Sequence, residues 1–250
     1  MRNFISEDDI EQAILQKLEG DPFQYGILRC DPSPDKRELL PDGTGRSSKK
    51  ECVLPLILRE ALARLNPDIP GEKLEEIARD LCRDFSATDM TATNYKYYNQ
   101  IRNGIKISLR RNGKEDFDFV KLVDFDRPEN NTFTAVSQMW IQGRVYWRRP
   151  DVLIFINGLP MVFVELKNSI VKVEEAYNDN LKNYLRDIPN LFAFNQICVL
   201  SNGLETRLGA FNATYNHFFG WLKVNSEKER PDRQALKEAG TVGESSVRYF

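Results

Sequence analysis

Two apolar stretches joined by a short polar turn, within residues 149–167, constrain the fold of this chain more than any other segment. Charged side chains stand only at the ends, where Asp151 opens the first stretch and Glu165 and Lys167 close the second. The Asn157-Gly158 dipeptide between them is typical of β-hairpins. We therefore expect two neighbouring strands, over 151–156 and 161–167, that carry their charges at the open end of a hairpin.

The register of this hairpin decides whether its charged side chains meet. Glu165 and Lys167 project from the same face, because side chains alternate along a strand. A three-residue turn places Asp151 opposite Glu165, whereas a two-residue turn places it opposite Val164, on the other face. The Asn-Gly dipeptide favours the shorter turn, and a β-bulge would reconcile the two arrangements. The residues alone leave the register open.

The remaining pattern is that of a mixed α/β domain. Residues 6–18 predict a helix with Ser6 as its N-cap, because Ile10, Ile14 and Leu18 form one apolar stripe. Further helices are expected near 51–65, 71–85 and 172–186, strands at 105–109, 117–123, 132–141 and 197–200, and a polar loop at 31–49. We assign 1–222 to one domain, with a helical insertion at about 50–86, and 223–250 to a linker.

The composition excludes several classes of protein. The 250 residues carry a net charge of −2. They include a single histidine, His217, and this excludes a zinc enzyme with several histidine ligands. The four scattered cysteines argue against zinc ribbons and disulfide scaffolds, and we assign them and His217 to packing. We find no signal peptide, membrane span or phosphate-binding loop, and expect a soluble cytoplasmic protein with no membrane contact.

Two carboxylates and a lysine at one end of a hairpin suit metal-assisted hydrolysis of a phosphodiester. Asp151 and Glu165 are hard oxygen ligands of the kind that hold Mg²⁺. Such a metal lowers the pKa of a bound water and neutralises the charge that develops on phosphate. Lys167 would position the water or the phosphate, and a backbone carbonyl near Leu166 would add a ligand.

The same residues resemble the PD-(D/E)xK nuclease signature, with Pro150-Asp151 followed by Glu165-Leu166-Lys167. The flanking residues are similar to the N-terminal nuclease domain of the R (motor) subunit of type I restriction enzymes over residues 4–212. The flanking motifs are Asn130-Asn131-Thr132-Phe133, Asn157-Gly158-Leu159-Pro160 and Ser201-Asn202-Gly203. The resemblance implies a restriction-endonuclease-like mixed sheet flanked by helices, and the register that brings Asp151 to Glu165.

The resemblance also implies further site residues and partners. The family's glutamine and tyrosine on the next helix correspond to Asn180 and Tyr184, so the glutamine is replaced here by the shorter asparagine. A first-helix glutamate that helps to hold metal in related nucleases corresponds to Glu11, on placement alone. The implied partners are double-stranded DNA and the methylase and specificity subunits. ATP would serve only a motor that follows the linker, so we expect the chain to be a fragment.

Basic residues gather in two places. Arg144, Arg148 and Arg149 lead directly into Asp151, and we assign them to DNA contact. The second group lies within 90–114, without acidic residues, and is equally well explained as a solvated face: Lys96, Arg102, Lys106, Arg110, Arg111 and Lys114. The alternatives to a restriction nuclease are a non-catalytic DNA-binding or docking module of the same fold, and a repair or resolvase nuclease.

Overall fold

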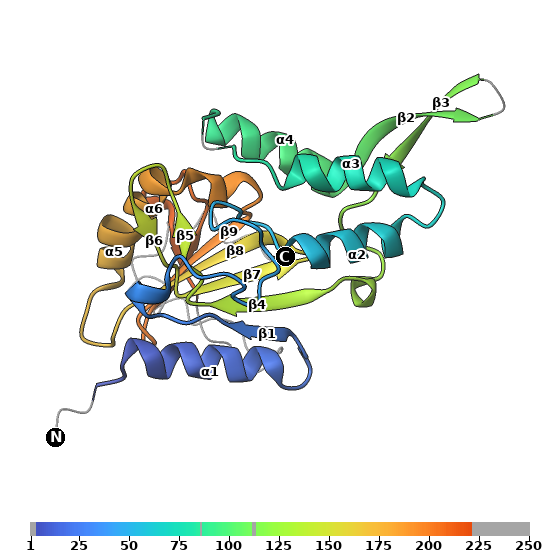
Figure 1. Ribbon diagram of the computed structural model, residues 1–250. Coiled ribbons are helices and arrows are strands. Elements are labelled where there is room, and N and C mark those ends of the chain that lie inside the picture. Colours follow the sequence, from blue (N-terminus) through green and yellow to red (C-terminus); the bar gives the residue numbers. More distant parts are fainter. Residues whose placement is uncertain (1–3, 86, 112–113, 222–250) are drawn as a thin grey trace, which may run out of the picture.

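The computed structural model of the chain describes residues 4–85, 87–111 and 114–221. Their centre is a seven-stranded mixed sheet in the order β1-β4-β7-β8-β9-β10-β11, in which β1–β4 and β8–β9 are parallel pairs (Figure 1). The strands are β1 Gly26–Arg29, β4 Phe133–Ser137, β7 Val152–Ile156, β8 Leu159–Leu166, β9 Ile197–Ser201, β10 Thr206–Gly209 and β11 Phe219–Gly220. The predicted restriction-endonuclease-like mixed sheet is confirmed.

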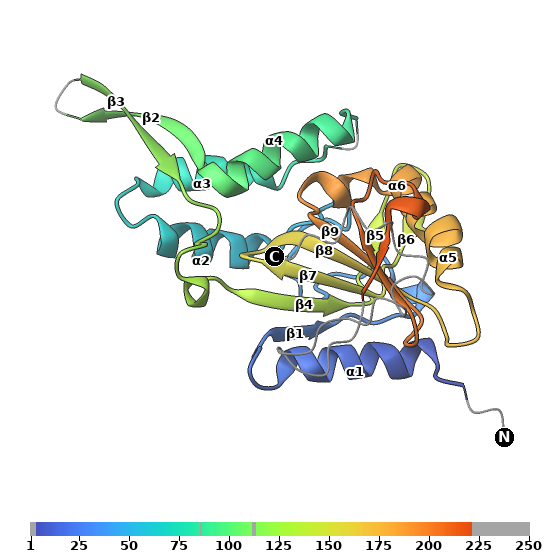
Figure 2. The ribbon, with the colours of Figure 1, turned by 180° about the vertical axis from the view of Figure 1, so that it is seen from behind.

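Helices cover the two faces of this sheet. Helix α1 (Glu7–Glu19) begins at the predicted cap, where Ser6 and Asp9 form a reciprocal capping box, and it packs Ile10 and Leu15 on one face. The other face is covered by α5 (Val173–Glu175), a π-helical turn (Ala176–Leu181) and α6 (Lys182–Asp187), the elements of the predicted helix at 172–186 (Figure 2). The sheet is therefore the middle layer of three.

The insertion forms a separate lobe beside the ends of β7 and β8. Its helices are α2 (Pro55–Leu65), α3 (Gly71–Leu81) and α4 (Met90–Asn103), the last of which the sequence did not predict. The strands predicted at 105–109 and 117–123 are β2 (Ile105–Arg111) and β3 (Lys114–Val120), which form a two-stranded arm apart from the main sheet (Figures 1 and 2). Leu159 and Met161 of β8 join the lobe's apolar core.

Short elements complete the described residues. The strands β5 (Ile141–Gln142) and β6 (Trp147–Arg148) form a small hairpin before β7. Single 3₁₀ turns occur at Pro34–Lys36, Pro128–Asn130, Pro189–Ala193 and Tyr215–His217. No helix in the described ranges is long and apolar enough to span a membrane. The expected linker at 223–250 lies outside the described residues.

The packing roles expected of the histidine and the cysteines are confirmed only in part. Cys30, Cys52 and Cys198 are buried and Cys82 is partly buried, all as free thiols. His217 is exposed, so its assignment to packing was wrong. It ends a short turn in which its Nδ1 lies 2.8 Å from the Thr214 hydroxyl. The next residue, Phe218, is the one whose side chain is buried.

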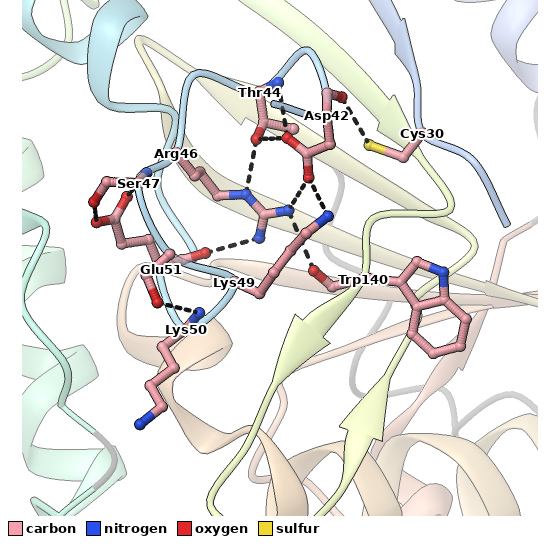
Figure 3. A network of polar contacts seen from close by, with 10 residues as sticks. Cys30, Asp42, Thr44, Arg46, Ser47, Lys49, Lys50, Glu51 and Trp140 are labelled. Carbon is pink, nitrogen blue, oxygen red and sulfur yellow. Dashed lines mark hydrogen bonds and ion pairs between the residues drawn. The ribbon is translucent and has the colours of Figure 1, made fainter. Parts of the chain in front are cut away.

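A buried ion cluster orders the polar loop predicted at 31–49 (Figure 3). Asp42 Oδ2 accepts hydrogen bonds from Arg46 Nη2 at 2.6 Å and from Lys49 Nζ at 2.7 Å. Arg46 also donates to the Trp140 carbonyl at 3.2 Å and to the Glu51 carbonyl at 3.0 Å. The cluster therefore ties this loop to the segment between β4 and β5.

Candidate active site

The β7–β8 hairpin settles the register that the residues alone leave open. Its turn is the short one, and Asn157 and Gly158 both have positive φ, as a type I′ turn requires. The register then shifts through a β-bulge, after which Val152 pairs with Val164. The next position outward places Asp151 opposite Glu165. The structure thus combines the turn favoured by Asn-Gly with the register implied by the family resemblance.

The three predicted catalytic side chains gather at this end of the hairpin. Asp151 Oδ2 accepts a hydrogen bond of 2.7 Å from the backbone N–H of Leu166, which fixes one carboxylate against the next strand. Lys167 Nζ lies 3.7 Å from Glu165 Oε1, and the Lys167 side chain is only 16% exposed. The structure therefore brings Asp151, Glu165 and Lys167 together.

The helices behind the sheet supply two further predicted residues. Asn180, in the π-helical turn, donates from Nδ2 to Glu165 Oε1. The Tyr184 hydroxyl donates to the carbonyl of Arg149 at 3.0 Å and also interacts with the Glu165 carboxylate. Asparagine at 180 thus reaches the carboxylate despite its shorter side chain, because the π-helical turn lies directly against β8.

Glu11 reaches the same site from α1, through a residue that the sequence analysis missed. Glu11 is 5% exposed, and its Oε2 accepts a hydrogen bond from Gln138 Nε2. Gln138 follows β4 directly, and its backbone N–H donates to the Asp151 carbonyl at 2.9 Å. No local pattern marks Gln138, since its role depends on the pairing of β4 with β7, two strands that are distant in sequence.

Burial dominates the electrostatics of the three carboxyl groups. It raises the pKa of Asp151, and hydrogen bonding from Leu166 together with the charge of Lys167 offsets only part of that rise. It also raises the pKa of Glu165 well above its ordinary value, reinforced by the negative charge of Asp151. Burial raises the pKa of Glu11 as well. Such a cluster favours bound protons or a bound cation.

The donor set fits a hard divalent cation. Glu165 Oε2 is buried without a hydrogen-bond partner, which leaves an oxygen of the correct type for such an ion. Within the described ranges, no group of three or more His, Cys, Asp and Glu side chains is arranged to hold a metal. Mg²⁺ is commonly held by one or two carboxylates and several waters, so Asp151 and Glu165 suffice as protein carboxylates for it.

Comparison with known proteins identifies the family. The family model of the type I restriction enzyme R protein N terminus matches residues 4–217. The chain belongs to this family. It is 32% identical over 233 residues to the HindI endonuclease subunit of Haemophilus influenzae, a match that covers 92% of this chain and 21% of that relative.

A putative type I restriction enzyme, the MjaIXP endonuclease subunit of Methanocaldococcus jannaschii, is 30% identical over 250 residues, which cover 96% of this chain and 22% of that protein. The chain therefore spans about a fifth of the length of these relatives. Their names describe endonuclease subunits.

The three arginines before Asp151 differ in their exposure and in the contacts that they make. Arg144 is exposed at the turn between β5 and β6. The Arg148 Nε donates to buried Asp187 at 2.7 Å, so its charge is already balanced within the R-protein domain. Arg149 lies over the Trp140 ring at 5.2 Å and donates to the Pro32 carbonyl at 2.5 Å. Of the three, Arg144 is the most exposed.

The other basic group lies far from the carboxylates, on α4 and the arm. Arg102 Nη1 donates to the Tyr98 hydroxyl at 3.0 Å, and the Lys106 ammonium lies 4.2 Å from the centre of the Phe117 ring. Lys96 lies similarly over Tyr97. Arg110, Arg111 and Lys114 stand on β2 and β3, but their side chains are outside the described part of the structure.

The raised pKa of Glu165 predicts an unusual dependence of stability on pH. Because the folded state binds this proton more tightly than the unfolded chain does, metal-free stability should fall as pH rises above the ordinary pKa of 4.5. Glu165→Gln should remove the part of that decline that Glu165 causes, while the raised pKa values of Asp151 and Glu11 retain the rest. The stability of the variant should therefore fall less than that of wild type between pH 4.5 and neutral pH. Urea unfolding in a chelating buffer at several pH values measures this.

A partly exposed glutamate provides the control for that measurement. Glu75 pairs with Arg59, whose hydrogen bond lowers the pKa of the Glu75 carboxyl. Above pH 4.5, Glu75→Gln should be less stable than wild type by a constant amount, and this difference should disappear as pH falls below 4.5. Parallel stability curves for wild type and Glu165→Gln would contradict the assignment of the buried proton to Glu165.

Proposed function

We propose that this domain is the Mg²⁺-dependent endonuclease domain of a type I restriction R subunit and hydrolyses DNA phosphodiester bonds. The observation that carries the proposal is the register of the β7–β8 hairpin. It sets Asp151 opposite Glu165 and holds Lys167 Nζ 3.7 Å from the Glu165 carboxylate. Membership of the R-protein family supports the same conclusion.

The site residues have different roles in that reaction. Asp151 and Glu165 would hold Mg²⁺, which supplies a hydroxide-like water and neutralises charge on the phosphate. Lys167 orients the attacking water or the scissile phosphate for in-line displacement. Asn180 and Tyr184 hold the Glu165 carboxylate, and a backbone carbonyl near Leu166 would add a further oxygen ligand. Glu11 adds negative charge at the same place.

The partners follow from the family. We infer that the substrate is double-stranded DNA, whose phosphates would be contacted by Arg144, the most exposed of the three arginines before Asp151. We place the domain in a complex with methylase and specificity subunits, which would supply sequence recognition, and with a motor region that uses ATP. The chain covers about a fifth of its relatives, so these partners belong to the whole protein.

Metal binding is the first test of this function. We expect Mn²⁺, as a probe for Mg²⁺, to bind wild type with one measurable heat of binding. The affinity should fall at least ~10-fold in Asp151→Ala, because one of two carboxylate ligands is lost. Isothermal titration calorimetry measures both. The control is Asp31→Ala, which removes an exposed carboxylate paired with Lys36 and should bind as wild type does.

Two outcomes would overturn the proposal. One is equal Mn²⁺ binding by wild type and Asp151→Ala, which would place the metal elsewhere. The other is no binding by wild type, either alone or with a DNA duplex present, which would favour a non-catalytic module that has kept the fold.

A further inference from the structure

Gln138 has an unusual backbone at the meeting point of three elements of the site. It follows β4 directly and has φ +57°, the left-handed region that residues other than glycine rarely adopt. Its N–H donates to the carbonyl of Asp151 at 2.9 Å, so its position is fixed relative to the first residue of the hairpin. Such backbone strain persists where the surrounding structure demands a particular side-chain direction.

The amide nitrogen of Gln138 holds one of the carboxyl groups. Nε2 donates to Glu11 Oε2, while the backbone N–H of the same residue holds the Asp151 carbonyl. The bond to Glu11 orients the amide, because a carboxylate accepts hydrogen bonds and the amide oxygen cannot donate one.

The amide oxygen is consequently left without a partner. Gln138 Oε1 and Glu165 Oε2 are both buried oxygens for which the described residues provide no hydrogen bond. Buried polar atoms are nearly always satisfied, so two such oxygens on residues that both neighbour Asp151 indicate a missing ligand. Carboxylate and amide oxygens are both ligands of hard divalent cations.

We propose that Gln138 belongs to the metal site, with Oε1 as a neutral oxygen ligand of the divalent cation, either directly or through one bound water. Its Nε2 meanwhile holds Glu11 in place. The inference rests on the proposed function, because it assigns a further residue to the same site. Gln138, Asp151 and Glu165 then bring the ends of three strands, β4, β7 and β8, to one cation.

Two substitutions separate this role from a merely structural one. Gln138→Met removes both the oxygen and the amide hydrogens, and Mn²⁺ affinity should fall roughly 10–100-fold. Gln138→Glu retains an oxygen ligand and adds charge, so at pH 8 it should bind Mn²⁺ at least as tightly as wild type. If Gln138 only positioned Glu11, the glutamate would break that hydrogen bond and weaken binding as methionine does.

The control is Gln196→Met, at a glutamine that binds backbone atoms at the start of β9, away from the carboxylates. It should bind Mn²⁺ as wild type does, and urea unfolding without metal should show that all three variants fold. Wild-type affinity in Gln138→Met, or equal weakening in the methionine and glutamate variants, would overturn the proposal. Either result would leave the assignment of Asp151 intact if Asp151→Ala still loses the metal.

Discussion

DNA cleavage should fall by roughly 10²–10⁴-fold when Lys167 is replaced by alanine, the range typical of a positioned proton-transfer or orienting group. Its ammonium lies 3.7 Å from Glu165 Oε1 on a side chain that is only 16% exposed, so no other part of the site can take its place without rearrangement. The measurement is the cleavage rate of a restriction complex that contains the full-length R subunit, because this chain covers only about a fifth of its relatives.

A neighbouring lysine provides the control for the loss of cleavage in Lys167→Ala. Lys172 is exposed, five positions further along the chain, at the N-cap of α5. Lys172→Ala removes the same charge from the same region and should cut at the wild-type rate. Lys167→Ala should also unfold in urea as a cooperative domain, which would separate lost chemistry from lost structure. Cleavage by Lys167→Ala at the wild-type rate would refute the catalytic assignment.

The hairpin illustrates how much of the site the sequence predicts. The two strands, their charged ends and the Asn-Gly turn are local features, and all are present in the structure. The β-bulge is not a local feature of the residues. It is fixed by the packing of β8 against β7 and β9, so only the family resemblance favoured the correct register.

Residues that act over long sequence distances were harder to predict. Helix α4 is polar over most of its length, and only Tyr97 and Ile101 are buried, so its apolar stripe is too narrow to recognise. Tertiary contacts hold the helix in place: Tyr97 packs on Phe194, with ring centres 4.5 Å apart. Gln138 was missed for the same reason, since its partners lie on α1 and directly before β7.

The loop at 31–49 provides the second large effect, on stability. Replacing Asp42 by alanine should cost about 3–5 kcal/mol, because it leaves two buried cations without their counter-charge. The side chains of Arg46 and Lys49 are 0% and 5% exposed, and that of Asp42 is 9% exposed. Such a loss is a large fraction of the ~5–15 kcal/mol that stabilises a typical domain. Thermal unfolding should shift downward by on the order of 10 °C.

An exposed pair with the same geometry provides the matched control. Lys36 Nζ lies 2.6 Å from Asp31 Oδ2, as close as the buried contacts, but the two side chains are 50% and 43% exposed. Asp31→Ala should leave the unfolding midpoint unchanged, since exposed ion pairs often contribute nothing measurable. Equal shifts in the two variants would show that burial does not set the strength of the cluster.

The pH dependence of the same cluster checks the cause. Burial alone would raise the pKa of Asp42, but hydrogen bonds from Lys49 and Thr44 and the charge of Arg46 together lower it below 3.8. The contribution to stability should therefore be complete at neutral pH and be lost only as pH falls below 3.8. The difference in stability between wild type and Asp42→Ala should be constant from pH 6 to 8 and should become smaller at acid pH.

The same cluster is connected to the metal site. Because Arg46 also holds the Trp140 carbonyl, two residues after Gln138, Asp42→Ala should bind Mn²⁺ more weakly than the Asp31→Ala control.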